Sequence, residues 1–127
     1  MKLITLFESF TGAEVKDCIS NEKLIFIIQE NEMGKAIGKN GFNVKKIEGK
    51  LSKKIKLVEF TNDIKQFVKN LIYPIEAQDI SFDNRIVTIR GKDAGSKAMI
   101  IGRERHNIRH LSEIVGRYFD IKEIRVV

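Results

Sequence analysis

Two segments of the 127-residue chain share a spacing of glycine, cation and asparagine that is suited to binding anions. Residues 37–47 read IGKNGFNVKKI, and residues 101–111 read IGRERHNIRHL. In each segment a glycine and a cation precede the expected start of an amphipathic helix, where backbone N–H groups lack partners and the helix dipole is positive. A phosphate backbone is the anion we expect.

The tip of the first segment consists of Lys39 and Asn40 between two glycines, Gly38 and Gly41. Glycine at both ends lets the backbone turn sharply and leaves no Cβ in the way of a ligand. Lys39 can pair with a phosphate, and Asn40 can donate a hydrogen bond. Close approach of a sugar-phosphate strand is therefore expected here.

The residues beside this tip predict an apolar groove with polar groups at its edge. Ile37, Val44 and Ile47 are expected to form the floor on which bases lie. Asn43 and Lys45, on the first turn of the following helix, complete the predicted binding set of this segment.

The second segment departs from the first at its tip. Arg105 stands where the first segment has its second glycine, and Glu104 would repel a phosphate. Arginine side chains can nevertheless form charge-assisted hydrogen bonds with phosphate. The predicted binding residues here are Gly102, Arg103, Arg105, Asn107 and Arg109. We expect the first segment to grip the ligand and the second to extend or orient it.

Positive charge is concentrated around the first segment. The chain carries 23 Lys and Arg against 17 Asp and Glu, a net charge of +6. Eight lysines and a single acidic residue, Glu48, lie between residues 34 and 56. This is the electrostatic pattern of a polyanion-binding surface. Lys46, Lys50 and Lys53 fall on the polar side of the expected helix and can serve solubility alone.

Composition indicates a compact globular chain, since 43% of the residues are hydrophobic. Cys18 is the only cysteine, which excludes an internal disulfide and fits a reducing cytosol. We interpret it as a buried structural thiol. No apolar run approaches the ~18 residues that span a membrane, and the N-terminus lacks a signal-peptide pattern. A cytoplasmic protein with no membrane partner is expected.

Apolar periodicity predicts the same elements in both halves of the chain. A helix opens each half and ends near Gly12 and Pro74. Two strands follow, at 15–20 and 23–29 in one half and at 76–82 and 85–90 in the other, with turns at 21–22 and 83–84.

A short helix is expected after each hairpin, over 31–37 and 93–101, with Asn31 and Asp93 as N-caps. Glu30 and Glu32 flank the first of these helices and are explained by capping. A longer helix follows each loop, and strands at 57–60 and 121–127 close the halves.

The predicted fold class is α+β, with the order α-β-β-α-α-β occurring twice. Each half would form a three-stranded sheet covered by helices on one face. The boundary falls near residues 61–63, which gives domains 1–61 and 62–127. No Gly/Ser-rich or Pro-rich linker separates them.

The first loop and this element order resemble the KH family, whose G-x-x-G loop clamps about four nucleotides of a single strand. Gly38-Lys39-Asn40-Gly41 matches that loop fully. The element order is similar to the type II, prokaryotic form of KH. Two tandem units of this kind, the second with a degenerate loop, resemble the archaeal NusA-like proteins of transcription termination and antitermination.

The resemblance implies binding of single-stranded RNA, no cofactor, and a role in transcription elongation, termination or antitermination. Single-stranded DNA stays open as a ligand. RNA polymerase is a partner on the resemblance alone, because nothing in the residues themselves points to it.

Enzyme chemistry is not expected. Residues 34–40 are one residue too short for a nucleotide-binding P-loop, and Asn40 stands where such a loop needs Ser or Thr. His106 and His110 lie one helical turn apart, but no neighbouring residue completes a metal site.

Among the phenylalanines, Phe42 directly follows Gly41 and is the one that we expect could touch a sugar or base.

Two other functions remain open from the sequence. One keeps the KH fold but places the protein at the ribosome or in translation. The other is a protein-interaction module whose basic loop binds an acidic partner surface.

Overall fold

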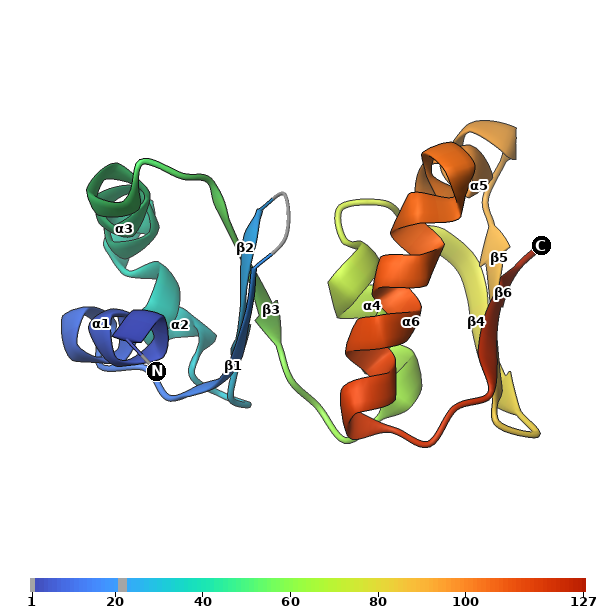
Figure 1. The fold of residues 1–127 in the computed structure, drawn as a ribbon, viewed down its shortest axis with the longest axis horizontal. Coiled ribbons are helices and arrows are strands. Elements are labelled where there is room, and N and C mark those ends of the chain that lie inside the picture. The colour runs from blue at the N-terminus through green and yellow to red at the C-terminus, as the bar shows by residue number, and fades with distance from the viewer. Residues whose placement is uncertain (1, 21–22) are drawn as a thin grey trace. The chain divides into compact units, whose positions relative to one another are not determined.

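The computed structural model describes residues 2–20 and 23–127, which divide into two compact units between Thr61 and Asn62 (Figure 1). The turn expected at residues 21–22 lies outside the described residues. No described helix is both long enough and apolar enough to cross a membrane.

The first unit consists of one three-stranded sheet and helices on one of its faces (Figure 1). Its strands lie in the order β1-β2-β3, with β1 antiparallel and β3 parallel to β2. Its elements are α1 (Lys2–Thr11), β1 (Val15–Ser20), β2 (Leu24–Ile28), α2 (Met33–Ile37), the short 3-10 turn η1 (Lys39–Gly41), α3 (Phe42–Leu51) and β3 (Ile55–Glu59).

The second unit has the same element order and the same strand pairing. Its sheet runs β4-β5-β6, again with one antiparallel and one parallel pair. Its elements are α4 (Ile64–Ile72), β4 (Ala77–Asp83), β5 (Ile86–Gly91), α5 (Ala94–Ile101), the 3-10 turn η2 (Arg103–Arg105), α6 (His106–Tyr118) and β6 (Glu123–Val126). The predicted α+β class and the three-stranded sheets are confirmed.

The core of the first unit forms where β2 meets the helices. Leu24, Phe26 and Ile28 alternate along β2 and join one buried cluster with Phe7 of α1 and Ile47 of α3. The rings of Phe7 and Phe26 stack with centroids 4.4 Å apart. Ile47 is fully buried in this cluster, so the expectation that it forms the floor of a groove is wrong.

In the second unit the packing centres on α4, α6 and β5. Phe67 of α4 is fully buried, and its ring lies 5.8 Å from that of Tyr118 at the end of α6. Val87 and Ile89 of β5 are also fully buried. Helical periodicity predicted α4 correctly because its apolar positions all point to this core.

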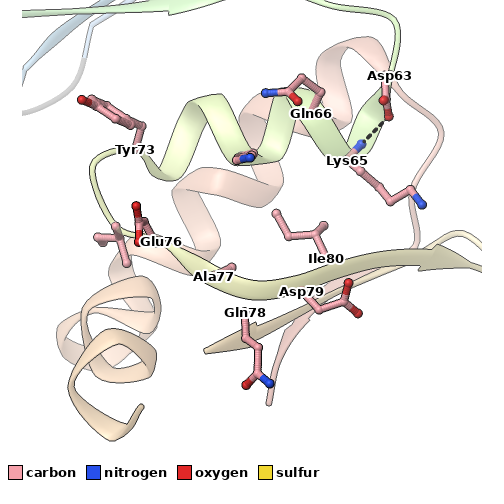
Figure 2. A pocket seen from close by; sticks show the side chains of 11 residues that line it. Asp63, Lys65, Gln66, Tyr73, Glu76, Ala77, Gln78, Asp79 and Ile80 are labelled. Carbon is pink, nitrogen blue, oxygen red and sulfur yellow. Dashed lines mark hydrogen bonds between the residues drawn. The ribbon is translucent and has the colours of Figure 1, made fainter. Parts of the chain in front are cut away.

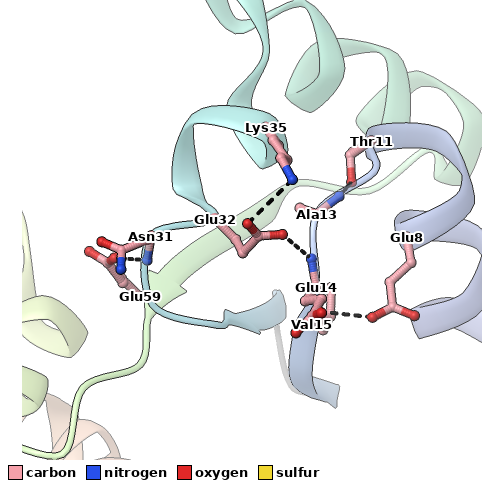
Figure 3. A network of polar contacts seen from close by, with 9 residues as sticks. All are labelled: Glu8, Thr11, Ala13, Glu14, Val15, Asn31, Glu32, Lys35 and Glu59. Atoms are coloured by element: carbon pink, nitrogen blue, oxygen red, sulfur yellow. Dashed lines mark hydrogen bonds and ion pairs between the residues drawn. The ribbon is translucent and has the colours of Figure 1, made fainter.

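Carboxylates at α1 and at the start of α2 bind backbone N–H groups around the start of β1 (Figure 3). Glu32 accepts a hydrogen bond from the Glu14 N–H at 2.9 Å, and its other oxygen lies 3.5 Å from Lys35 Nζ. Glu8 accepts from the Val15 N–H at 2.9 Å. The predicted cap at Asn31 is wrong: Glu32 is the N-cap residue of α2, and its side chain makes no capping hydrogen bond. Its carboxylate instead accepts the hydrogen bond from the Glu14 N–H, on a segment 18 residues earlier.

In the second unit one local prediction is confirmed and another is displaced by one residue. Asp93 caps α5 as predicted, accepting a hydrogen bond from the Ser96 N–H at 2.7 Å. That hydrogen bond lowers the pKa of the Asp93 carboxyl. The hairpin turn lies one residue later than expected, because Asp83 pairs with Ile86 and the two turn residues, Asn84 and Arg85, both have positive φ.

An asparagine joins the two helices on either side of each loop. Asn43 Nδ2 donates to the carbonyl of Lys35 at 2.9 Å, and Asn107 Nδ2 donates to the carbonyl of Met99 at 2.9 Å. The asparagine therefore fixes the angle at which the chain leaves α2 or α5 and enters the next helix. The sequence carried a signal for this contact, since the asparagine occurs at the same place in both segments.

The two glycines of the first loop are required for different reasons. Gly38 has φ 75° and ψ 172°, a conformation that almost only glycine adopts, and a Cβ there would lie 2.7 Å from Asn43 Cγ. Gly41 has φ 74° and ψ 16°, and a Cβ there would meet nothing within 4 Å. Gly38 is therefore needed for packing, whereas Gly41 only avoids left-handed strain.

We expect Gly38→Ala to lower the free energy of unfolding of the first unit by about 2–4 kcal/mol, since it adds a clash to backbone strain. Gly41→Ala should cost about 1 kcal/mol or less, because left-handed strain is partly offset by a less flexible unfolded chain. Urea unfolding followed through the amide NMR signals of β2 measures both. Equal losses from the two substitutions would contradict the distinction.

Candidate nucleic-acid interface

The helix after each loop begins without a side-chain cap. The N-cap residue of α3 is Gly41 and that of α6 is Arg105, and neither makes a side-chain capping hydrogen bond. The first N–H groups of an α-helix have no intrahelical acceptor, and the helix dipole adds positive potential at this end. The very first N–H of each helix is already used, since Phe42 N–H donates to the Lys39 carbonyl and His106 N–H to the Arg103 carbonyl. The N–H groups that follow in the first turn are the backbone donors that suit a phosphate.

The residues predicted to bind in the first unit lie in the loop and in the adjoining ends of α2 and α3. Lys39, Asn40 and Lys45 are exposed, and Ile37 retains 38% of its accessible surface. The remaining members are half-buried, namely Gly38, Gly41, Asn43 and Val44. Contact with nucleic acid stays a prediction for all of them, and the Nδ2 group of Asn43 is already engaged with Lys35.

The lysines of the first unit differ in how far they are available to a ligand. Seven of the eight between residues 34 and 56 are exposed, and Lys56 on β3 is half-buried. Burial, and to a smaller extent the charge of Lys23, lowers the pKa of the Lys56 ammonium. Lys46, Lys50 and Lys53 are exposed along and just beyond α3, as expected for its polar side.

The second loop has the backbone of the first in spite of its different residues. Gly102 has φ 76° and ψ 168°, matching Gly38, and Glu104 has φ 53° and ψ 32°, matching Asn40 at 55° and 29°. Arg105 takes the left-handed conformation of Gly41, with φ 64°. The sequence change therefore alters charge and side-chain bulk while the path of the chain is kept.

A groove of about 280 Å³ lies beside the second loop, between α6 and β6. Arg105 and Arg109, both predicted binding residues, line its helix side together with Ile108. Lys122 and Ile124 line its strand side. Arg103 and Asn107 are exposed on the loop and first helical turn, with Asn107 engaged through Nδ2 and Gly102 half-buried.

Sequence reasoning missed a larger cavity of about 450 Å³ in the second unit (Figure 2). It lies between α4 and β4 and is lined by Lys65, Lys69, Tyr73, Glu76 and Asp79, among others. The cations Lys65 and Lys69 come from α4, whereas the carboxylates Glu76 and Asp79 lie just before β4 and on it. None of these residues belongs to a predicted binding set. No spacing signal marked them, because they come from a helix and a strand whose proximity is set by the fold.

The two histidines and the single cysteine are the side chains to consider as metal ligands or nucleophiles. The rings of His106 and His110 are nearly parallel with centroids 6.5 Å apart, and the described residues hold no group of three His, Cys, Asp or Glu suited to a metal ion. Cys18 is half-buried against the core of the first unit. Burial, then the Asp17 carboxylate, raises the pKa of the Cys18 thiol, which keeps it protonated and unreactive.

Comparison with known proteins identifies a family that matches the part of the chain containing the first loop. The KH domain family matches residues 3–71. Three relatives, each described as a probable transcription termination protein NusA, align with almost the whole chain. The one from Methanococcus vannielii is 42% identical over 98% of this chain and 74% of its own length.

The other two relatives are more distant. That from Methanocaldococcus jannaschii is 30% identical over 98% of this chain and 70% of its own length. That from Halococcus morrhuae is 30% identical over 99% of this chain and 93% of its own length.

A solved structure, that of the protein APE1850, is similar over 99% of this chain and 96% of its own, with a TM-score of 0.74 and 28% identity. The same family is indicated by the fold of the described residues, by the G-x-x-G loop at Gly38–Gly41 and by relatives that align with almost the whole chain. The chain belongs to the KH-domain family and is a NusA-like member of it.

Proposed function

We propose that this protein binds single-stranded RNA and acts as a transcription termination or antitermination factor. The observation that carries the proposal is the loop Gly38–Gly41, which places exposed lysines at the uncapped start of α3 in a chain of the KH family. The names of its full-length relatives supply the role in transcription.

Binding would rest on a clamp around the strand backbone. Phosphate oxygens would accept hydrogen bonds from N–H groups in the first turn of α3 and from Lys39, while Lys45 adds charge one turn further along the helix. Val44, half-buried beside the loop, would support a base. Few groups here read base edges, so we expect modest sequence preference.

We propose further that residues 1–61 and 62–127 are both type II KH domains. The two units share element order, strand pairing and loop backbone, which supports this. In the second unit Arg103, Arg105 and Arg109 would contact phosphate through their side chains. This unit would extend or orient a strand gripped by the first.

RNA polymerase is a proposed partner because the relatives carry a transcription-factor name. No enzymatic activity and no cofactor are proposed. The alternative roles at the ribosome or as a protein-interaction module predict different partners. Co-purification with ribosomes, or tight protein binding that survives Gly41→Asp without RNA affinity, would favour them.

Gly41→Asp is expected to reduce RNA affinity by roughly tenfold or more, since it sets a carboxylate against the bound phosphates. The substitution suits the test because a side chain at Gly41 meets nothing within 4 Å, so the fold should be kept. Fluorescence anisotropy with a labelled single-stranded RNA measures the affinity. Circular dichroism verifies the fold.

Replacement of both Arg103 and Arg105 by Ala provides the matched change in the other loop. A smaller loss of affinity is expected from this double substitution. A loss as large as that caused by Gly41→Asp would contradict the ranking of the two units.

In a transcription assay with the cognate RNA polymerase, the wild type should alter readthrough at terminators, and Gly41→Asp should not.

Salt dependence tests the electrostatic part of the clamp. For single strands, the slope of log K against log salt changes by about 0.7 for each phosphate contact. Lys39→Ala should therefore make the slope less steep by roughly that amount, whereas Lys65→Ala on α4 should leave it unchanged. Running the series with single-stranded DNA as competitor determines the sugar preference. An unchanged slope for Lys39→Ala would remove Lys39 from the clamp.

A further inference from the structure

We propose that Phe42 is a stacking site for one nucleobase, outside the groove, on a strand whose phosphates lie at the first loop. This inference rests on the proposed function and specifies how a nucleotide beyond the groove is held. Phe42 is the first residue of α3 and directly follows Gly41.

Phe42 is exposed to an extent that the fold does not require. It retains 57% of its accessible surface, while the other aromatic side chains of the first unit, Phe7, Phe10, Phe26 and Phe60, are buried or half-buried. An aromatic ring left in water at the start of a helix adds little to the stability of the unit. Its exposure is accounted for if a ligand covers it.

Phe42 lies outside the set of positions that correspond to the groove of the second unit, because its counterpart His106 does not line that groove. In the second unit, Arg105, Ile108 and Arg109 form the helix side of the groove, and Gly41, Val44 and Lys45 hold the corresponding positions in the first unit, 64 residues earlier. Phe42 and Val44 are two residues apart on α3, so they lie about 200° apart around the helix. A base on Phe42 would therefore lie on the outer side of the loop, next to but not within the groove.

The charges around Phe42 favour a nucleotide over other apolar ligands. Lys46 Nζ lies 5.5 Å from the centre of the Phe42 ring, one helical turn away, and Lys39 and Lys45 are exposed nearby in sequence. An aromatic face flanked by ammonium groups matches a base attached to a phosphate. A peptide with an acidic side chain would use the lysines but would not need the ring.

The second unit has a related arrangement at the same positions. His106 corresponds to Phe42 and His110 to Lys46, and the two imidazole rings stack with an interplanar angle of 14°. Both units therefore place a flat ring at the first position of the helix that follows the loop. In the first unit the ring is apolar and its neighbour is a cation, which is the stronger combination for stacking a base.

The experiment compares Phe42→Ala with Tyr73→Ala, which removes an aromatic ring that is 71% exposed and lies in the other unit on the cavity between α4 and β4. Each full-length variant is titrated with a labelled single-stranded oligouridylate and with an abasic strand of the same length. Phe42→Ala should weaken binding of the oligouridylate roughly tenfold and leave binding of the abasic strand unchanged. Tyr73→Ala should affect neither.

Phe42→Trp adds a spectroscopic readout, because the chain contains no tryptophan. This variant should keep the wild-type affinity, and its fluorescence should be quenched by the oligouridylate but not by the abasic strand. Retention of affinity by Phe42→Trp together with its loss in Phe42→Ala assigns the effect to the ring.

The failures of the two proposals can be told apart. Wild-type affinity in Phe42→Ala, equal losses for both strands, or unquenched tryptophan while the strand is bound would each overturn the stacking site alone. Absence of any binding by the wild-type protein would overturn RNA binding and the stacking site with it.

Discussion

The sharp reversal between two short helices at the first loop is the constraint on which the proposed interface depends. It requires a residue without a side chain at Gly38, because Asn43 occupies the space where a Cβ would be. The same asparagine donates to the carbonyl of Lys35 and so ties the end of α2 to the start of α3. With this turn fixed, the exposed Lys39 lies next to the start of α3, which no side chain caps. An anion meets donors that are already oriented, which reduces the entropy lost on binding.

The two units have loops with the same backbone path but different side chains. Gly102 and Asn107 repeat the close packing of Gly38 and Asn43, with a Cβ at Gly102 lying 2.6 Å from Asn107 Cγ. The second glycine of the first loop has no such neighbour, and the second unit replaces it with Arg105 at modest backbone strain. Packing thus restricts the first glycine and leaves the last loop position free to vary. That freedom allows one fold to carry a basic glycine loop in one unit and an arginine-lined groove in the other.

Predictions from local sequence succeeded where interactions between residues close together in the chain decided the structure. The helices over Lys2–Thr11 and Ile64–Ile72 follow from apolar periodicity, and the cap at Asp93 follows from a side chain that reaches its own backbone. They failed where a distant partner competed. Glu32 is recruited by the Glu14 N–H of another segment rather than by its own helix, and Asn31 takes a left-handed conformation outside α2. The hairpin turn is a separate case: it lies one residue later than predicted because the pairing of Asp83 with its near neighbour Ile86 sets the register.

The sequence by itself determined the repeated element order, the α+β class and the loop that resembles the KH family, because these depend on spacing along the chain. Only the tertiary structure decided which residues of that region can meet a ligand. Ile47 and Val44 are separated by less than one helical turn, yet the first is fully buried in the core and the second lies half-buried beside the loop. The cavity between α4 and β4 and the exposure of Phe42 likewise arise from how elements pack. Packing joins residues that are distant in sequence and separates neighbours, and spacing alone does not encode either result.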